Sequence, residues 1–245
     1  MAILASASSS EESVSRNLIL ERLPATIALV ALAQLIAILI GVMLGVYAGW
    51  RRGGRWTISP AASLTLYSTP SFWLGMILVV IFSTGLGWLP GYGAYSPGVA
   101  AGSLDWLFDH LRHLALPVSA VALGLIGQYV VVGRAAMSDV VTEDYMVTTR
   151  AKGLTNWQML MRHAFRNAML PVVTLVTLNL GYVVAGAITV EPVFVWPGIG
   201  GLTVEALNAR DYPVLQGIFL LLGASIVVAN LVADLAYGLL DPRVR

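Results

Sequence analysis

Residues 25–49 read ATIALVALAQLIAILIGVMLGVYAG, an apolar run without a charged side chain. At a rise of about 1.5 Å per residue, about 20 helical residues cross the roughly 30 Å of hydrocarbon in a bilayer. Lipid offers no partner to backbone N–H and C=O groups, so a single spanning segment satisfies them only as a helix. The stretch Ala25–Gly49 therefore predicts a membrane-spanning helix.

Four more runs of this kind follow along the chain, and the short alternating segments typical of membrane strands are absent. Hydrophobic residues make up 58% of the sequence and charged residues 11%, whereas soluble domains have about 25% charged residues. The sequence predicts an all-α membrane protein, with an external N-terminal segment over residues 1–23 and a transmembrane domain over residues 24–245. The four further spans are Pro60–Ser83, Leu114–Gly133, Ala168–Val190 and Tyr212–Ala233.

The distribution of basic residues predicts the orientation of these five spans, because loops next to spans keep Lys and Arg in excess on the cytoplasmic side. Most of the 14 basic residues fall on the side that carries the C-terminus and the connection 137–167. That side is predicted to be cytoplasmic, and residues 1–23 then lie outside. The cytoplasmic set is Arg51, Arg52, Arg55, Arg134, Arg150, Lys152, Arg162, Arg166, Arg243 and Arg245, and the external set is Arg16, Arg22, Arg112 and Arg210.

The connection between the third and fourth spans contains a second helix signal. Thr155 and Gln158 have the spacing of a capping box, which predicts a short helix from there to about Arg166. Its apolar residues would form one stripe, at spacings i, i+3, i+4 and i+7. Such a helix can lie on anionic lipid, pack against the rest of the chain or dock into a groove of a soluble partner, and the residues alone leave all three open. The stripe consists of Trp157, Leu160, Met161 and Ala164.

Two blocks of the chain resemble the permease subunits of binding-protein-dependent ABC importers, in the version shared by dipeptide, oligopeptide and nickel permeases. The first, with RAKGL at 150–154 and RHAFRNA at 162–168, is similar to the coupling loop of that family. Tyr145 precedes it and Leu170-Pro171 follows it, as in the family. The second, EPVFVWPGIG at 191–200, is similar to the family's external segment before the last span.

The resemblance implies the ABC importer type I permease fold and the role of a pore-forming subunit that moves di- or oligopeptides by alternating access. It also implies the partners, namely a second homologous permease, two subunits that bind ATP and Mg²⁺, and an extracytoplasmic solute-binding protein. The assembly would lie in the lipid of a bacterial-type plasma (inner) membrane, and nucleic acid is not expected as a partner. The residues carried over are Arg150, Ala151, Lys152, Gly153, Leu154, Trp157, Met161, Arg162, His163, Arg166 and Asn167 in the coupling segment, and Glu191, Pro192, Phe194, Trp196, Pro197 and Gly198 in an external gate-like segment.

In that family the short helix of the coupling loop sits in a cleft of the ATPase subunit and passes its movement to the membrane helices. Gly153 supplies a permissive backbone there, and Pro171 is expected to prevent a continuous, unstrained helix from the loop into the fourth span. Where the wider importer family begins its motif with Glu-Ala-Ala, this chain has Val147-Thr148-Thr149. Complete members of the subgroup have six spans, so the first of them is expected to be missing here.

Motifs of catalysis and of nucleotide binding do not occur in the sequence. The patterns G-x-x-x-x-G-K-[ST], G-x-S-x-G and H-E-x-x-H are absent, and there is no cysteine. His110 and His113 lie in Leu104–Leu114, a stretch expected to form an amphipathic helix on the outer surface, and no third metal ligand is near them. We therefore expect a transport subunit rather than an enzyme, without a metal or cofactor of its own and with ATP hydrolysis in its partner subunits.

Polar residues inside the spans are the candidates for a solute pathway, because polar groups are costly in lipid. Gln128 and Asn179 lie well inside their spans and are the preferred pathway-lining residues, and hydrogen bonding to a neighbouring helix is the alternative for each. The remaining candidates are Gln34, Asn230 and Asp234.

Three alternatives to a peptide importer stay open at this point, one of them a membrane scaffold without transport activity. An ion-coupled secondary transporter would require internal repeats and ion-binding carboxylates near the membrane midplane. No convincing repeat is found, and Asp234, the one acidic residue inside a span, lies near its end. An ABC importer for nickel or another small solute is the third alternative, because the residues do not identify the cargo.

Overall fold

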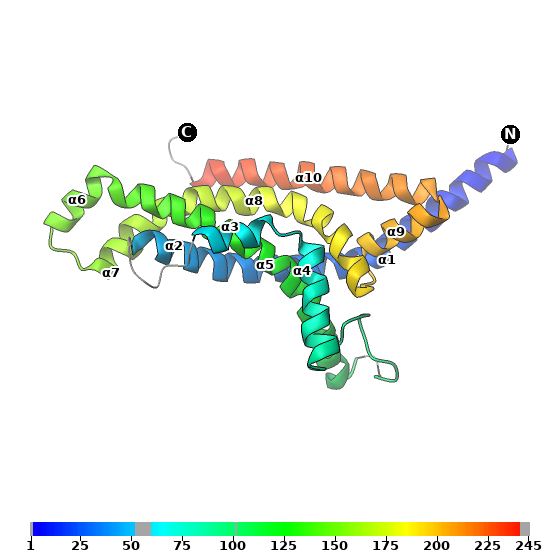
Figure 1. Ribbon diagram of the computed structural model, residues 1–245. Helices are drawn as coiled ribbons and strands as arrows, with labels where there is room; N and C mark the ends of the chain where they lie inside the picture. The colour runs from blue at the N-terminus through cyan, green and yellow to red at the C-terminus, as the bar shows by residue number, and fades with distance from the viewer. Residues whose placement is uncertain (1, 52–59, 101, 241–245) are drawn as a thin grey trace. The chain divides into compact units, whose positions relative to one another are not determined.

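The computed structural model describes residues 2–51, 60–100 and 102–240, and these residues form helices and connecting turns without a strand (Figure 1). The α-helices are α1 (Ala2–Ala37), α2 (Met43–Trp50), α3 (Pro60–Ser68), α4 (Ser71–Leu78), α5 (Leu104–Thr142), α6 (Asp144–Ala151), α7 (Asn156–Met159), α8 (Phe165–Val190), α9 (Ile199–Ala209) and α10 (Tyr212–Leu240). Wide π-helical turns follow α1, α4 and α7 at Ile38–Val42, Val79–Gly85 and Leu160–Ala164, and a 3₁₀ turn, Glu191–Phe194, follows α8.

Three of the described helices are long and apolar enough to cross a membrane, and the broken pair α3–α4 makes a fourth candidate. The three are Ser13–Trp50, Leu104–Thr142 and Tyr212–Val232. The predicted run Ala168–Val190 lies in α8, where the side chains of residues 180–187 fall outside the described part of the chain. The side chain of Asp234 falls outside it as well.

Several helix bounds differ from the sequence-based expectation. α1 is helical well before Ala25 and includes Pro24, so the segment expected ahead of the first span continues into it without a break. The run Pro60–Ser83 is interrupted at Thr69 and Pro70. Pro70 has no N–H to continue the ladder, and its ring disfavours the α conformation at the preceding residue, which explains the break.

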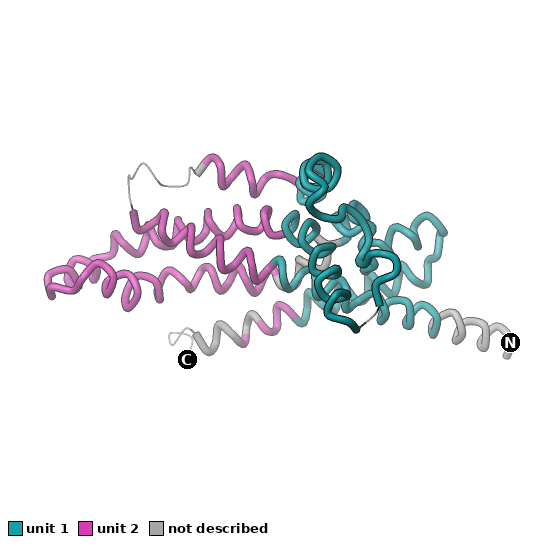
Figure 2. The backbone as a smooth tube through the Cα atoms, turned by 90° about the horizontal axis from the view of Figure 1, so that it is seen from below, with its two compact units in different colours: residues 1–33, 71–121, 180–228 teal, residues 34–70, 122–179, 229–245 magenta. Residues whose placement is uncertain are grey.

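The described chain consists of two compact units, coloured separately in Figure 2. Unit 1 contains residues 1–33, 71–121 and 180–228, and unit 2 contains residues 34–70, 122–179 and 229–245. The core of unit 1 joins α1, α9 and α10 through Ile19, Ile199, Leu202, Ala206, Val214 and Ile218. The core of unit 2 includes Ala37, Val42, Val46, Tyr129, Ala136, Met137, Met146, Met159, Ala164, Ala168 and Val172.

Close contact between α5 and the helical stretch from α1 to α2 organises unit 2. A Cβ atom at Gly41 would lie 2.7 Å from the Cβ of Tyr129, and one at Gly45 would lie 2.7 Å from the carbonyl oxygen of Val130. A Cβ at Gly49 would lie 2.7 Å from the carbonyl oxygen of Arg134. Glycines at a spacing of four let helix backbones approach closely in membranes. The Gly41–Gly45 pair therefore serves helix packing, and Gly49 extends the same seam.

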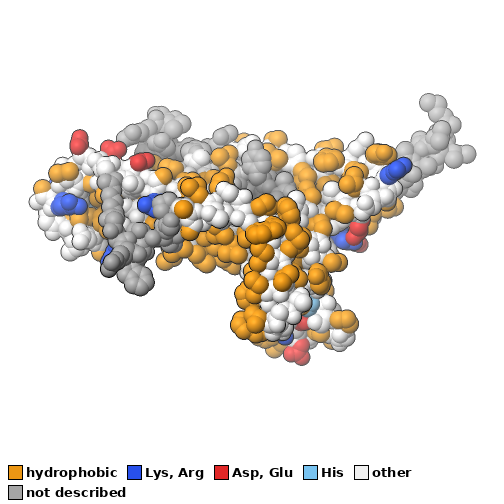
Figure 3. Space-filling view, in the orientation of Figure 1, with side chains coloured by type: hydrophobic (Ala, Val, Ile, Leu, Met, Phe, Trp, Pro, Cys, Tyr) orange, Lys and Arg blue, Asp and Glu red, His pale blue; other side chains and the backbone are white. Residues whose placement is uncertain are grey.

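Large apolar side chains remain exposed on the spanning helices. On α4, Phe72, Trp73 and Met76 are exposed, and hydrophobic side chains cover this helix on the face seen in Figure 3. Continuous apolar surface of this kind is unfavourable in water and suits contact with lipid.

Candidate functional site

The coupling segment, which we define as residues 150–167, begins with a tight turn between α6 and α7. Gly153 has φ 73°, and a Cβ there would meet no atom within 4 Å. A left-handed backbone is strained for residues that carry a Cβ, so the turn favours glycine for conformational reasons alone. The predicted capping box is confirmed, because the Thr155 N–H donates to Oε1 of Gln158 at 3.0 Å and the Gln158 N–H donates to Oγ1 of Thr155 at 3.3 Å.

The helix that begins after Thr155 does not end near Arg166. It continues through the π-helical turn Leu160–Ala164 into α8, and α8 runs through Pro171. The expectation that Pro171 prevents a continuous helix is therefore wrong. A proline removes one N–H from the helical ladder, and packing around a membrane helix offsets that loss. Here the flanking residues Ala168 and Val172 are buried in the core of unit 2.

The predicted apolar stripe divides between two environments. Ala164 is fully buried in the core of unit 2, together with the neighbouring Met159. Trp157 is 67% exposed and Met161, one turn further, is 44% exposed. The segment thus packs on its own unit through one edge and presents an apolar pair of side chains, four residues apart, on the other.

Most of the other coupling residues also lie on the surface. The Nδ2 of Asn167 donates to the Tyr145 hydroxyl at 2.8 Å, which ties α6 to the first turn of α8. Leu154 and His163 are half-buried. Arg150, Ala151, Lys152, Gly153, Arg162, Arg166 and Asn167 are exposed.

The external segment, which we define as residues 191–201, is built around a buried carboxyl group. The side chain of Glu191 is fully buried, and its Oε1 accepts a hydrogen bond from the Thr26 hydroxyl at 2.6 Å. Its Oε2 accepts from the Gly200 N–H at 2.6 Å and from the Gly201 N–H at 3.3 Å. The Ile199 N–H donates to the same Thr26 hydroxyl at 2.8 Å. Glu191 and Thr26 together satisfy the first N–H groups of α9, which have no partner within the helix.

The space around this carboxyl group is closed by Gly198 and Trp196. Any Cβ at residue 198 would overlap the Glu191 carboxyl group. Gly198 has φ −114°, so glycine is required by space rather than by backbone conformation. The Nε1 of the buried Trp196 donates to the carbonyl oxygen of Ala25 at 3.2 Å, a second link from the external segment to α1.

The electrostatics of Glu191 combine two opposing effects. The pKa of its carboxyl group is raised above the ordinary value, because the effect of burial exceeds the opposing effect of the hydrogen bonds from Thr26, Gly200 and Gly201. Both oxygens act as acceptors, and the N-terminus of α9 favours negative charge beside it. Thr26 was not among the residues carried over from the resemblance. A lone hydroxyl at the start of an apolar span was its only signal in the sequence.

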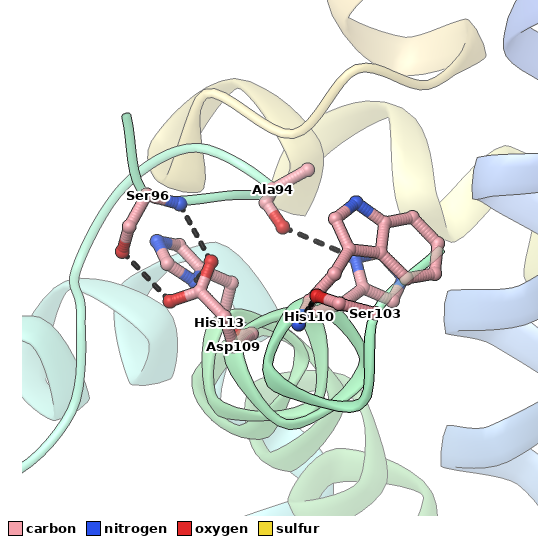
Figure 4. Close-up of polar contacts among 7 residues, drawn as sticks. Ala94, Ser96, Ser103, Asp109, His110 and His113 are labelled. Carbon is pink, nitrogen blue, oxygen red and sulfur yellow. Dashed lines mark hydrogen bonds and ion pairs between the residues drawn. The ribbon is translucent and has the colours of Figure 1, made fainter. Parts of the chain in front are cut away.

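We call residues 86–103 the external loop, after the side of the membrane on which the sequence predicts them. An aromatic and polar cluster joins this loop to the start of α5 (Figure 4). Asp109 accepts hydrogen bonds from the Ser96 N–H at 2.6 Å and from the Ser96 hydroxyl at 2.7 Å. The Nδ1 of His110 lies 3.1 Å from the carbonyl oxygen of Ala94. The His110 ring stacks on Trp106, with centroids 5.6 Å apart, and lies 5.4 Å from the ring of Trp196 in the external segment.

His110 and His113 engage different partners within this cluster. The Nδ1 of His113 lies 2.8 Å from the carbonyl oxygen of Asp109, one helical turn before it. The predicted short helix over Leu104–Leu114 is the beginning of the long α5 rather than a separate element. Trp106, Tyr95 and His110 form a three-ring stack that holds the loop against α5.

The two residues expected to line a pathway meet one another inside unit 2. The Nδ2 of Asn179 donates to Oε1 of Gln128 at 3.0 Å and to the Tyr129 hydroxyl at 3.1 Å. The Tyr129 hydroxyl also accepts from Nε2 of Gln34, a buried residue whose Oε1 has no hydrogen-bond partner within the described part of the chain. Three helices, α1, α5 and α8, are thereby joined by polar groups. Gln128 and Asn179 are half-buried, whereas Tyr129 and Gln34 are buried.

Comparison with known proteins assigns the class to which this fold and these sites belong. A family described as the binding-protein-dependent transport system inner membrane component matches residues 23–245. The chain belongs to this family of transport permeases, as the two sequence blocks predicted.

Curated relatives are similar over nearly the whole chain. A protein named putative peptide transport system permease, from Brucella abortus (strain 2308), is 42% identical over 229 residues, which are 93% of this chain and 71% of the relative. The di/tripeptide transport system permease DppB of Pseudomonas aeruginosa (strain UCBPP-PA14) is 40% identical over 239 residues, with 91% and 70% covered.

The fold is also found among solved structures. A chain from an inward-facing conformation of the MetNI methionine ABC transporter superposes with a TM-score of 0.72 and 16% sequence identity, over 91% of this chain and 96% of the other. The predicted all-α fold of an ABC importer permease is therefore confirmed.

Proposed function

We propose that this chain is the pore-forming subunit of an ATP-driven importer that passes di- and oligopeptides across a bacterial inner membrane. The observation that carries the cargo assignment is the similarity of about 93% of the chain, at 42% identity, to a relative named as a peptide permease. Its membership of a transport permease family does not favour the alternative of an ion-coupled secondary transporter.

The partners are proposed from the family and from the exposed surface of the coupling segment. Trp157 and Met161 form an apolar pair beside exposed basic residues, a pattern suited to a groove in a soluble protein. We assign this surface to the ATP-binding subunits, which would hold ATP and Mg²⁺ and carry out hydrolysis. A second homologous permease would supply the other half of the pore, and a solute-binding protein would deliver the cargo from outside.

The orientation proposed for the chain follows from its basic residues. The coupling segment and the C-terminus lie in the cytoplasm, and the external loop 86–103 and the external segment face outward. The half-buried Gln128 and Asn179 are proposed to line the pathway in the interior between these two faces.

Uptake by whole cells tests the function. In a strain that lacks this chain, we expect loss of the import of labelled dipeptides and restoration by the chain together with its partner subunits. Unlabelled tripeptide should compete, and Ni²⁺ should not. Competition by Ni²⁺ alone would assign the nickel branch, and uptake that persists without the chain would refute the role in transport.

Purification tests the assembly independently. A tagged chain extracted in mild detergent should bring down a second permease and P-loop ATPases, and the eluate should hydrolyse ATP. A chain that purifies alone, shows no ATPase activity and still moves solute in vesicles driven by an ion gradient would favour the secondary transporter.

A further inference from the structure

The external segment contacts its surroundings on two sides, and the two sets of contacts differ in kind. Toward α1 and α9 the contacts are made by Glu191, a fully buried carboxyl group with three donors, and by the Trp196 Nε1–Ala25 hydrogen bond. Toward the external loop the segment makes one neutral backbone hydrogen bond, from the Gly93 N–H to the carbonyl oxygen of Phe194 at 2.8 Å. The Phe194 ring beside Gly75 of α4 and the Trp196 ring beside His110 at the start of α5 supplement that bond.

The contacts toward α1 and α9 form one hydrogen-bond network, in which each polar group is the partner of another. The Thr26 hydroxyl donates to Glu191 and accepts from the Ile199 N–H, so moving Thr26 away would leave the carboxyl group and α9 short of a partner. Gly198 lies so close that the Glu191 carboxyl group has no room to shift toward it. Separating a buried carboxyl group from its hydrogen-bond partners is costly, because neither water nor another donor replaces them.

The contacts toward the external loop, α4 and the start of α5 have the opposite character. The Phe194 ring lies against Gly75 of α4, and the Trp196 ring lies 5.4 Å from the His110 ring. Apolar and ring contacts of this kind slide and re-form over short distances, as in the shear motions of packed helices. Breaking a single neutral hydrogen bond costs little free energy when water reaches the donor and the acceptor on opening.

We infer that Glu191 is a positioning residue that makes α1, the external segment and α9 move as one body, so that any opening on the outer side occurs between this body and the external loop 86–103. The inference rests on the proposed function, because it concerns the conformational cycle of an importer. It assigns Glu191 no contact with solute.

Distances between spin labels test this directly, and the absence of cysteine from the chain allows labels at chosen sites only. Leu20 on α1, Leu207 on α9 and Tyr92 in the external loop are all exposed and outside the network, so a Cys at each is expected to leave uptake intact. In the assembled importer, the Leu20–Leu207 distance should be the same in the nucleotide-free and the vanadate-trapped states. The Tyr92–Leu207 distance should shift between them.

Two results would overturn the inference. One is a Leu20–Leu207 distance that shifts as much as the Tyr92–Leu207 distance, and the other is a Tyr92–Leu207 distance that does not change in an importer active in uptake. Measuring peptide uptake by the labelled complexes and by the unlabelled parent complex distinguishes a failure of this inference from a failure of the proposed function. If the unlabelled parent complex takes up no peptide, the proposed function is wrong, whatever the distances show.

Matched variants test the role of Glu191 itself. Glu191→Gln should broaden the Leu20–Leu207 distance distribution and lower uptake per ATP hydrolysed, whereas the same change at the exposed Glu21 should do neither. If Glu191→Gln does not assemble, Thr26→Val should give the same broadening, and Thr26→Ser, which keeps the hydroxyl, should restore the narrow distribution. A narrow distribution in Thr26→Val would contradict the inference.

Discussion

At the scale of single residues, the sites of this chain depend on how buried polar groups are satisfied. The Glu191 carboxyl group and the amide of Asn179 both lie among groups that accept or donate to them, and each connects elements distant in the sequence. A buried polar group left without its partner costs about 1–3 kcal/mol. Substitutions at these positions are therefore expected to lower the stability of the chain, whether or not they also affect transport.

Gly198→Ala tests the space beside Glu191. The added methyl group overlaps the carboxyl group, and overpacking of this kind costs about 1–3 kcal/mol. We expect a lower thermal midpoint for the detergent-solubilised chain, read from intrinsic fluorescence. Gly223→Ala in α10, where a Cβ meets no atom within 4 Å, serves as the control and should be neutral or slightly stabilising. Equal midpoints for the two variants would contradict the packing described here.

Asn179→Ala distinguishes structural hydrogen bonding from contact with solute. Loss of the amide leaves Gln128 and the Tyr129 hydroxyl without this donor, so we expect a lower thermal midpoint, by an amount that corresponds to about 1–3 kcal/mol. If Asn179 also lines the pathway, the variant should in addition show a raised KM for dipeptide uptake, measured in the strain that lacks the native chain. A variant whose midpoint falls while its KM is unchanged would remove Asn179 from the proposed pathway.

At the scale of elements, the capping box of the coupling segment was predicted correctly, whereas the end of its helix was not. The capping box and the glycine turn depend on neighbouring residues, and local sequence reveals them. The end of the helix depends on packing around Pro171 and Ala168, which a proline rule applied to an isolated helix leaves out. The same holds at Pro24, which lies inside α1.

Gly153→Val tests the turn before this helix. A β-branched residue at φ 73° is strained, at a cost of about 1–3 kcal/mol. We expect the importer to assemble and hydrolyse ATP while peptide uptake falls, because the coupling segment is held in a different position. Gly153→Asn, which tolerates the left-handed conformation, should retain most of the uptake. Normal uptake by Gly153→Val would refute the role of the turn.

Trp157→Ala tests the exposed apolar pair. Because Trp157 is 67% exposed, the thermal midpoint of the isolated chain should not change. Binding of the ATPase subunit should weaken by about 2 kcal/mol or more, as for aromatic residues at the centre of an interface. Co-purification from detergent and ATPase activity of the eluate measure this. Met159→Ala is the contrasting variant, since Met159 is buried and its loss should lower the midpoint.

At the scale of the whole molecule, composition and apolar runs were enough to predict a helical membrane protein, and two motif blocks were enough to predict its family. The contacts within each unit could not be predicted in this way. Thr26 and Glu191 are far apart in sequence, as are Gly49 and Arg134. Their proximity follows from how helices pack, and no local periodicity encodes it. The proline at residue 70 indicates the helix break, but the continuous apolar run around it led to the prediction of one unbroken span.

The orientation of the whole chain can be checked with single cysteines. Lys152→Cys should react with a membrane-impermeant maleimide only after the cells are permeabilised, because the coupling segment is proposed to be cytoplasmic. Tyr92→Cys, at an exposed position in the external loop, should react in intact cells. The parent chain has no cysteine and supplies the blank. Labelling with the opposite sidedness would reverse the proposed topology.

The glycine seam of Gly41, Gly45 and Gly49 has a consequence for how natural variation in this protein is interpreted. Each of these positions has too little room for even one additional carbon atom. Homologous sequences are therefore expected to keep glycine at all three as strictly as they keep the coupling motif. A mutational scan ranked by lost uptake would place the two groups side by side, although invariance in the seam reflects the approach of two helix backbones and not an encounter with cargo or nucleotide.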